Sequence, residues 1–403
     1  MGILDTPGYS RAGARAAFSP QSRQPTALPA THVLAKQFDG RRSIYNATSD
    51  NGKKARIGLS QALAGNGLFR ILCAGDSITR GLSVSGITWD QSYPARLRSA
   101  LKASGYACAG DGFVVPAGYD APAVVDSRWT YTGTWNHNYA SSGYTWGARG
   151  GAVGSTAMYA TVEPCTSISM HWFNGIGNAV TIEIDGVAPA TNSTVTPAGG
   201  TTIGSVTWSG LANTTHTIKV TMTGTSFVLH GFDCTSANGF VVDNFGRSGS
   251  STDDWSLTGW RDHLTLALRP QIANAAGTNL TILGLGTNDA LRDPVSSNGA
   301  APAQYSTQLQ SIITAIKANS ELMLIAPPPI GNYYDAAAGM APYSDAIYTL
   351  AESNNLRVLD MYDRWVSYTD ARNGNLISTD TTHPSPTGYF DYREGVLALI
   401  GAK

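Results

Sequence analysis

Two short segments far apart in the chain contain the residue types that a serine needs for nucleophilic catalysis. Ser77 lies near the beginning, in Gly75-Asp76-Ser77, and Asp380 and His383 lie near the end. A serine hydroxyl is a weak nucleophile at neutral pH, so it needs a base within hydrogen-bonding distance. That base needs a third group that fixes its tautomer. The sequence offers all three groups.

The residues around Ser77 predict a strand, a turn and a helix. The apolar run 69–74 ends at Gly75, and helical spacing resumes from Tyr93 through Leu97 and Leu101. Ser77 would then lie just beyond the carboxyl end of a buried strand, where open α/β sheets form their ligand crevices. Taken alone, the tripeptide fits a serine that merely completes a turn.

His383 differs from the other histidines because a carboxylate precedes it by three residues, in a loop rich in Thr, Ser and Pro. In such a turn Asp380 can hold one ring nitrogen while the other faces outward. The remaining histidines have no obvious partner in the sequence: His32, His137, His171, His216, His230 and His263.

With these residues in place, the chain resembles the GDSL esterase and lipase family, in the subgroup called SGNH hydrolases. Four blocks identify that family, and all four occur here in order: Gly75–Ser77, Asn244–Gly249, Gly286–Asp289 and Asp380–His383. The resemblance covers roughly residues 50–125 and 240–401. It implies a three-layer α/β/α fold around a parallel sheet.

The resemblance also implies a role for each matching residue. Ser77 would be the nucleophile, His383 the general base and Asp380 the carboxylate that orients it. The backbone amides of Ser77 and Gly249 and the side-chain amide of Asn288 would form the oxyanion hole. Such fixed donors are commonly the largest catalytic contribution, at roughly 3 to 4 kcal/mol each. Singly, Gly249 fits a loop glycine and Asn288 a helix cap.

Other reaction classes find little support in the sequence. No G-x-S-x-G string is present, which argues against the nucleophile elbow of α/β-hydrolases. We find no H-E-x-x-H, no paired C-x-x-C and no P-loop string. We therefore predict no metal site and no cofactor.

The amino-acid composition limits the classes of binding partner that we expect. The formal net charge of −1 gives no indication of nucleic acid, and charged residues make up 14% against about 25% in an average globular protein. Such a neutral polar surface suits sugars. No segment approaches the ~20 apolar residues of a membrane span, and the N-terminus lacks the apolar core of a signal peptide. We expect a soluble protein without signal-directed secretion.

The distance between the first two blocks predicts an insertion. From about Tyr131 the helical spacing gives way to short runs of alternating apolar residues bounded by turns, which is typical of antiparallel strands. We predict an inserted β-sandwich, resembling a jelly roll, within an α/β fold. The predicted boundaries are an extended arm at 1–48, the first hydrolase part at 49–125, the sandwich at 126–238 and the second hydrolase part at 239–403.

Aromatic residues gather at the start of this insertion. Trp129, Trp135, Tyr139 and Trp146 lie beside amide side chains, a combination that suits sugar rings. Equally, these residues could seal the interface between the two parts. Cys165 and Cys234 both fall within the insertion, where they could form a disulfide or remain buried thiols.

The sequence therefore favours a serine esterase that removes small acyl groups, most plausibly acetyl, from a carbohydrate. Alternatives are a lipase or thioesterase acting on longer acyl chains, and a glycan-binding adhesin whose hydrolase fold is incidental. The arm, the insertion and the missing signal peptide also resemble phage tail-associated esterases. That resemblance places the protein on a virion, with assembly through the arm, while a cytoplasmic hydrolase fits almost as well.

Overall fold

The computed structural model describes residues 43–48, 50–82, 87–116, 124–136, 148–200, 202–256, 279–291, 299–331 and 339–402. Most of the predicted arm, 1–48, lies outside these ranges. Its last part does not extend away from the fold, because Ile44–Tyr45 form strand β1 and pair with the central sheet. Among the described residues, no helix has both the length and the apolar character needed to cross a membrane.

The larger part of the molecule is built on a six-stranded sheet. In spatial order its strands are β1 (Ile44–Tyr45), β19 (Arg357–Asp360), β18 (Glu321–Ala326), β17 (Asn279–Gly284), β2 (Leu68–Gly75) and β16 (Gly239–Gly246). All neighbours are parallel except β1, which runs antiparallel to β19. The carboxyl ends of β2, β16 and β17 therefore meet at one edge of the sheet.

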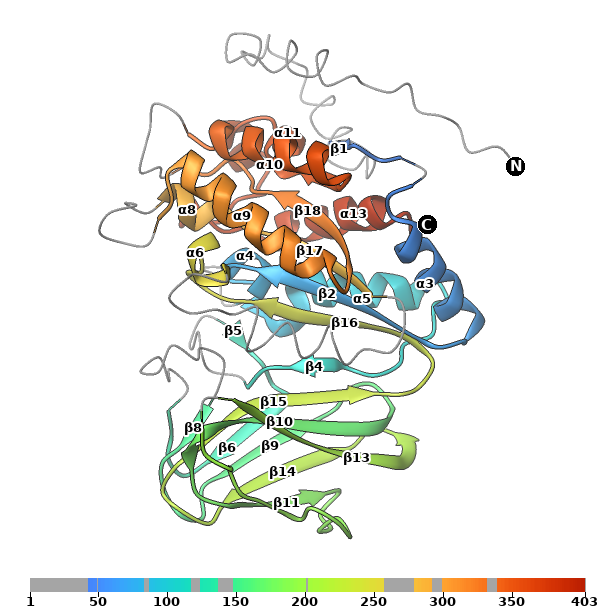
Figure 1. The fold of residues 1–403 in the computed structure, drawn as a ribbon, viewed down its shortest axis with the longest axis vertical. Helices are drawn as coiled ribbons and strands as arrows, with labels where there is room; N and C mark the ends of the chain where they lie inside the picture. Colours follow the sequence, from blue (N-terminus) through green and yellow to red (C-terminus); the bar gives the residue numbers. More distant parts are fainter. Residues whose placement is uncertain are drawn as a thin grey trace.

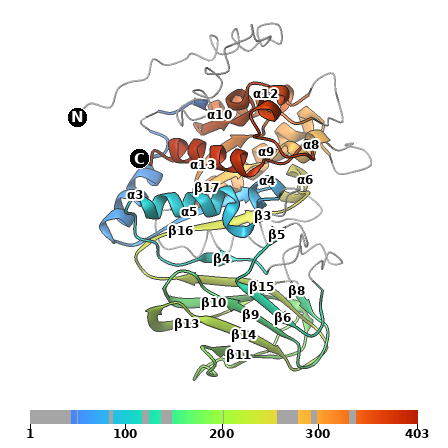
Figure 2. The same cartoon turned by 180° about the vertical axis from the view of Figure 1, so that it is seen from behind.

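Helices cover both faces of this sheet (Figures 1 and 2). One face packs on α9 (Pro302–Lys317) and α10 (Ala341–Asn354), and the other on α3 (Lys53–Ala64), α5 (Tyr93–Ala103) and α13 (Pro386–Ile400). Shorter helices lie at the ends of strands or between longer ones: α4 (Ser77–Arg80), η1 (Trp89–Gln91), α6 (Thr252–Trp255), α8 (Thr287–Leu291), α11 (Met361–Trp365) and α12 (Tyr368–Asn373).

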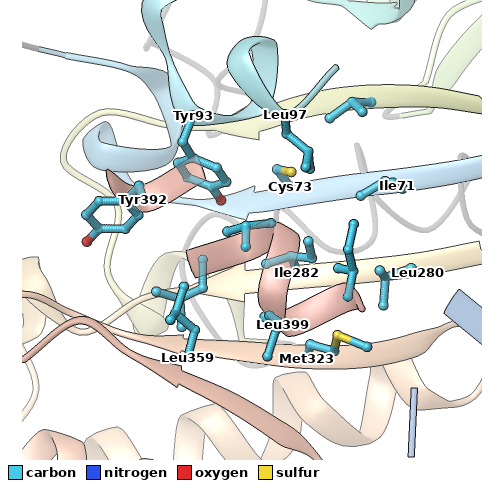
Figure 3. Close-up of a cluster of buried hydrophobic side chains, with 14 of the residues drawn as sticks. Ile71, Cys73, Tyr93, Leu97, Leu280, Ile282, Met323, Leu359, Tyr392 and Leu399 are labelled. Carbon is cyan, nitrogen blue, oxygen red and sulfur yellow. The ribbon is translucent and has the colours of Figure 1, made fainter. Parts of the chain in front are cut away.

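The strand that precedes Ser77 is buried on both faces, which explains its continuous apolar sequence. Along β2, Leu72 and Ala74 face the α9 and α10 side, whereas Ile71 and Cys73 face the α3, α5 and α13 side. Figure 3 shows this second cluster, with Cys73 beside Leu97 and Ile71 further along the same strand. Packing on both sides fixes the carboxyl end of β2 in place.

A second part of the molecule consists of two antiparallel sheets that enclose their own apolar core (Figure 1). One sheet has the order β13 (Ile203–Thr214), β10 (Cys165–Gly177), β15 (Phe227–Thr235), β8 (Ala148–Gly150) and β7 (Trp135–Asn136), with β4 (Gly112–Val114) also paired to β15. The other contains β12 (Thr194–Val195), β11 (Val180–Ile184), β14 (Thr217–Met222), β9 (Thr156–Ala160) and β6 (Trp129–Thr132). The predicted fold class, an α/β/α sheet with an inserted β-sandwich, is confirmed.

The sandwich reaches further back in the sequence than the boundary we placed at residue 126. Strand β4 lies before that boundary and pairs with β15 of the sandwich. Two further short strands, β3 (Ile87–Thr88) and β5 (Val124–Val125), form a separate two-stranded parallel sheet. The short turn-rich stretch around β4 gives too weak a periodic signal for sequence analysis to separate it from the α/β part.

Buried ion pairs connect the sandwich to the α/β part. The Arg70 guanidinium on β2 contacts Asp243 on β16 at 2.7 Å and Asp233 on β15 at 2.9 Å. Arg70 is 3% exposed and Asp243 is fully buried. Beside them the rings of Phe113 and Phe245 stack with centroids 5.1 Å apart. The two parts are therefore joined by buried ion pairs as well as by aromatic packing.

Candidate active site

Ser77 begins helix α4 directly after strand β2. The Asp76 carboxylate caps this helix by accepting a hydrogen bond from the Ile78 amide at 2.8 Å. Gly75 allows the turn, since a Cβ there would lie 2.3 Å from the carbonyl oxygen of Gly284. The sharp change from strand to helix places the Ser77 hydroxyl at the carboxyl edge of the sheet.

The structure brings Ser77, His383 and Asp380 together. The His383 Nε2 atom lies 2.8 Å from the Ser77 Oγ atom, and His383 Nδ1 lies 2.6 Å from an Asp380 carboxylate oxygen. With Nδ1 bonded to the carboxylate, Nε2 is free to accept the serine proton. The three side chains thus form a continuous hydrogen-bonded chain from hydroxyl to carboxylate.

The second oxygen of Asp380 is held by the loop itself. It accepts hydrogen bonds from the Ser378 hydroxyl at 2.6 Å, the Thr382 amide at 3.0 Å and the His383 amide at 2.9 Å. Burial raises the pKa of Asp380, but the hydrogen bonds from His383 and Ser378 outweigh this and bring it well below the usual range. The carboxylate therefore stays ionised and fixed. Sequence analysis missed Ser378, whose role depends on this turn.

The two remaining blocks converge near Ser77. Strand β16 ends at Gly246, and the following Arg247 amide donates to the Gly75 carbonyl at 2.9 Å. Gly249 then adopts a φ of 74°, in the left-handed region that favours glycine. The Asn288 side-chain amide donates to the Ser250 carbonyl at 2.9 Å. That bond uses one amide hydrogen and leaves the second available to a neighbouring oxyanion.

Beneath the site lie two carboxylates that sequence analysis did not assign. Burial raises the pKa of Asp76 to about 6, against hydrogen bonds from Ile78 and Thr287 that lower it. Burial likewise raises the pKa of Asp289 to about 7, despite hydrogen bonds from Thr252. Both residues belong to the motif blocks, but only the folded structure reveals that they are buried and close enough to interact.

The model of the GDSL-like lipase/acylhydrolase family matches residues 230–389, which contain the second, third and last blocks. This match supports the resemblance of the chain to that family. The resemblance drawn from the motifs is thus confirmed, and the chain is a carboxylic ester hydrolase. Ser77 lies before the matched residues and joins them in space, through the hydrogen bond from its Oγ to His383 Nε2 at 2.8 Å.

One solved structure superposes on most of this chain. This structure, described as a peptidoglycan O-acetylesterase, gives a TM-score of 0.66 at 17% identity, covering 88% of this chain and 97% of its own. Axe2, an acetylxylan esterase from Geobacillus stearothermophilus, gives a TM-score of 0.33 at 20% identity, covering 41% of this chain and 74% of its own.

A further partial likeness is the acetyl xylan esterase AlAXEase, with a TM-score of 0.32 at 18% identity, covering 40% of this chain and 79% of its own. No match was found among curated proteins. At these identities the first structure supports the fold, across both the hydrolase part and the sandwich. The two partial superpositions are too limited to support a conclusion about the fold.

The aromatic residues that we considered for sugar binding in this hydrolase differ in their exposure and packing. Trp129 is 6% exposed and packs in the sandwich core against Tyr159 and Phe232. It is therefore unavailable to a sugar and does not seal the interface between the parts, so both interpretations of this residue were wrong. The alternation of β6, which turns Trp129 inward, was hidden by the polar residues around it.

Trp135 is the other described member of that group. It is half-buried and packs on Tyr131 with ring centroids 5.6 Å apart, at the margin of the sandwich core. Tyr139 and Trp146 lie outside the described residues. Cys165 and Cys234, which the sequence left as either a disulfide or two thiols, are both buried and free.

Proposed function

We propose that this hydrolase is a serine esterase that removes acetyl groups from a carbohydrate, with Ser77, His383 and Asp380 as its catalytic residues. The observation that carries the proposal is the hydrogen-bonded chain from Ser77 Oγ through His383 to Asp380, at 2.8 and 2.6 Å. The geometry matches that of a nucleophile, a base and an orienting carboxylate.

In this proposal the reaction is a two-step acyl transfer. Ser77 Oγ attacks the ester carbonyl while His383 Nε2 takes its proton, and the protonated ring then donates that proton to the departing sugar oxygen. A water molecule then attacks the acyl-enzyme, with His383 again as the general base, and acetate is released. During both steps the amides of Ser77 and Gly249 and the second hydrogen of Asn288 would stabilise the negative oxygen.

The choice of acetyl and carbohydrate is supported by the fold neighbour. The structure described as a peptidoglycan O-acetylesterase matches this chain over 88% of its length, so the likeness includes the sandwich as well as the hydrolase part. A neutral surface with 14% charged residues is compatible with a glycan.

The test is acetate release from a panel of O-acetylated glycans, including peptidoglycan and xylan, with Ser77→Ala as the matched control. Loss of a triad member should lower kcat by at least about three orders of magnitude while leaving the fold intact. A parallel series of p-nitrophenyl esters tests acyl length, and a preference for long chains would replace acetyl by a lipase activity. Glycan binding in Ser77→Ala, with no ester turnover in the parent, would favour an adhesin.

A further inference from the structure

Consecutive residues at the start of α8 hold the loop that carries Gly249. The Asn288 amide holds the Ser250 carbonyl, as described above. The next residue, Asp289, is 1% exposed and accepts hydrogen bonds from the Thr252 amide at 3.1 and 3.2 Å. Its Oδ1 atom also lies 2.5 Å from the Thr252 hydroxyl. The loop from Gly249 to Thr252 is thus fixed at two adjacent points.

The Thr252 hydroxyl has more acceptors than it can serve. Besides Asp289 Oδ1, it lies 2.7 Å from the side-chain oxygen Oε1 of Gln308. A hydroxyl carries a single hydrogen, and neither an amide oxygen nor an ionised carboxylate can donate one. Either Thr252 donates to Gln308 and Asp289 supplies its own proton, or Thr252 donates to Asp289 and Gln308 loses its partner.

A third contact decides between these patterns. Gln308 Nε2 donates to the carboxylate of Asp253 at 2.8 Å, which fixes the orientation of the amide and turns Oε1 toward Thr252. Reversing the amide would set its oxygen against the Asp253 carboxylate. Thr252 must therefore donate to Gln308, and the hydrogen in the short contact with Asp289 must come from Asp289.

We propose that Asp289 is a positioning residue that works as a neutral carboxylic acid, donating to Thr252 and so holding the loop that presents the Gly249 amide. The proposal rests on the proposed function, because that loop matters only if its amide stabilises an oxyanion. It assigns a proton to a buried group that does not touch the substrate.

The surroundings of Asp289 favour the neutral form. Burial raises its pKa to about 7, and the negative charge of Asp76 acts in the same direction, while the hydrogen bond from the Thr252 amide opposes them. The Tyr343 hydroxyl of α10 lies 2.9 Å from the backbone carbonyl of Ala300 and 3.4 Å from that of Asp289. Within the part of the chain that the structure describes, no Lys, Arg or His side chain forms an ion pair with Asp289 that would stabilise its ionised form.

Ionisation would rearrange the loop support. The Thr252 hydroxyl would have to turn from Gln308 to the new carboxylate, and the half-buried Gln308 Oε1 would lose this donor. Donors in an oxyanion hole act through their alignment with the transition state, so a small shift of this loop lowers kcat with little effect on KM. We therefore expect kcat to fall as the pH rises through the pKa of Asp289.

Two variants at this position separate a neutral donor from a carboxylate. Asp289→Asn keeps the shape and places an N–H where the acid has its O–H, so its kcat should stay within about threefold of the parent. Asp289→Ala removes the donor and should lower kcat by about 10- to 100-fold. Thr252→Val, which removes the hydroxyl but keeps the amide, should resemble Asp289→Ala. If Asp289→Asn is as impaired as Asp289→Ala, the proposal is overturned.

The pH profile gives a readout that a purely structural role would not move. The alkaline decline of kcat should be present in the parent and absent in Asp289→Asn, which cannot ionise. Stability should follow the same sign. Burial raises the pKa of Asp289 from 3.8 to about 7. The neutral acid therefore contributes stability that is fully present below pH 3.8 and is lost as the pH rises through about 7. Asp289→Asn should therefore gain in Tm over the parent between those limits.

Infrared difference spectroscopy decides the protonation state without any turnover. The parent at pH 6 should show the C=O stretch of a buried carboxylic acid that is missing from Asp289→Asn, and absence of that band would refute the proposal. This readout is independent of esterase activity. A parent without turnover would sink the proposed function, while the infrared and Tm measurements would still decide the state of Asp289.

Discussion

Replacing Asp380 by asparagine tests the hydrogen-bond pattern around His383. One carboxylate oxygen accepts three donors, from Ser378, Thr382 and the His383 backbone, and the other accepts His383 Nδ1. An asparagine has one oxygen and one NH₂ group. With its oxygen toward the three donors, the NH₂ group faces Nδ1 and forces the ring hydrogen onto Nε2, where it meets Ser77.

The opposite orientation fails for a different reason, because it sets the NH₂ group against three donors at 2.6 to 3.0 Å. The first orientation should therefore prevail, and His383 then has no lone pair for the serine proton. We expect kcat to fall by about 10⁴-fold, the usual cost of the wrong tautomer, with little change in KM.

The assay is p-nitrophenyl acetate hydrolysis by purified Asp380→Asn, with Ser378→Ala as the control. The control removes one of three donors to an oxygen that retains its charge, so it should cost only about tenfold. Far-UV circular dichroism of both variants should match the parent. If Asp380→Asn keeps more than about a tenth of parental kcat, His383 does not depend on this carboxylate for its tautomer, and the triad assignment fails.

Three further predictions concern the sandwich and its attachment. Arg70→Met leaves the fully buried Asp243 without its cation and should lower the free energy of unfolding by about 3 to 5 kcal/mol in urea titrations. Burial raises the pKa of Asp243 to about 6 although Arg70 lowers it, so in Arg70→Met that pKa should rise further, and the loss should shrink as the pH falls and Asp243 takes up a proton. A loss under about 1 kcal/mol at high pH would contradict the prediction. His216 faces a carboxylate at 2.7 Å and two carbonyl oxygens, and although burial lowers its pKa, these hydrogen bonds raise it above 6.5. The stability it contributes should be present below pH 6.5 and decline as the pH rises through its folded pKa, a decline that His216→Gln should abolish in thermal melts. Of the cysteines, Cys73, Cys165 and Cys234 are fully buried, so Ellman's reagent should label Cys108 alone in the native protein and all four after denaturation.

The sequence predicted the elements whose signals are local. The apolar run before Ser77 and the helical spacing after Tyr93 correspond to β2 and α5, because burial on both sides of a parallel sheet leaves a continuous apolar strand. The alternation within the insertion likewise predicted antiparallel strands. The four motif blocks indicated the resemblance to the family, which the match to residues 230–389 supports independently.

What the sequence could not provide depends on contacts between distant segments. Asp289 looks like a helix-start carboxylate until Thr252 is seen beside it, and no spacing rule links the two. The sequence around Trp129 has a composition that suits a sugar-binding surface, yet the register of β6 turns this side chain inward against Phe232. Strand β4 is too short to be seen as a strand before β15 pairs with it.

The position of β16 has a consequence for anyone who wants to shorten this enzyme. This strand is the outer edge of the catalytic sheet, and β4 and Phe113 lie against it from the sandwich side. Excising the sandwich would expose unpaired backbone amides and carbonyls together with Phe245, a template on which other chains add as strands. Minimal versions should therefore retain residues 111–115 or carry a charged replacement for that cover, or they will precipitate before their catalysis can be measured.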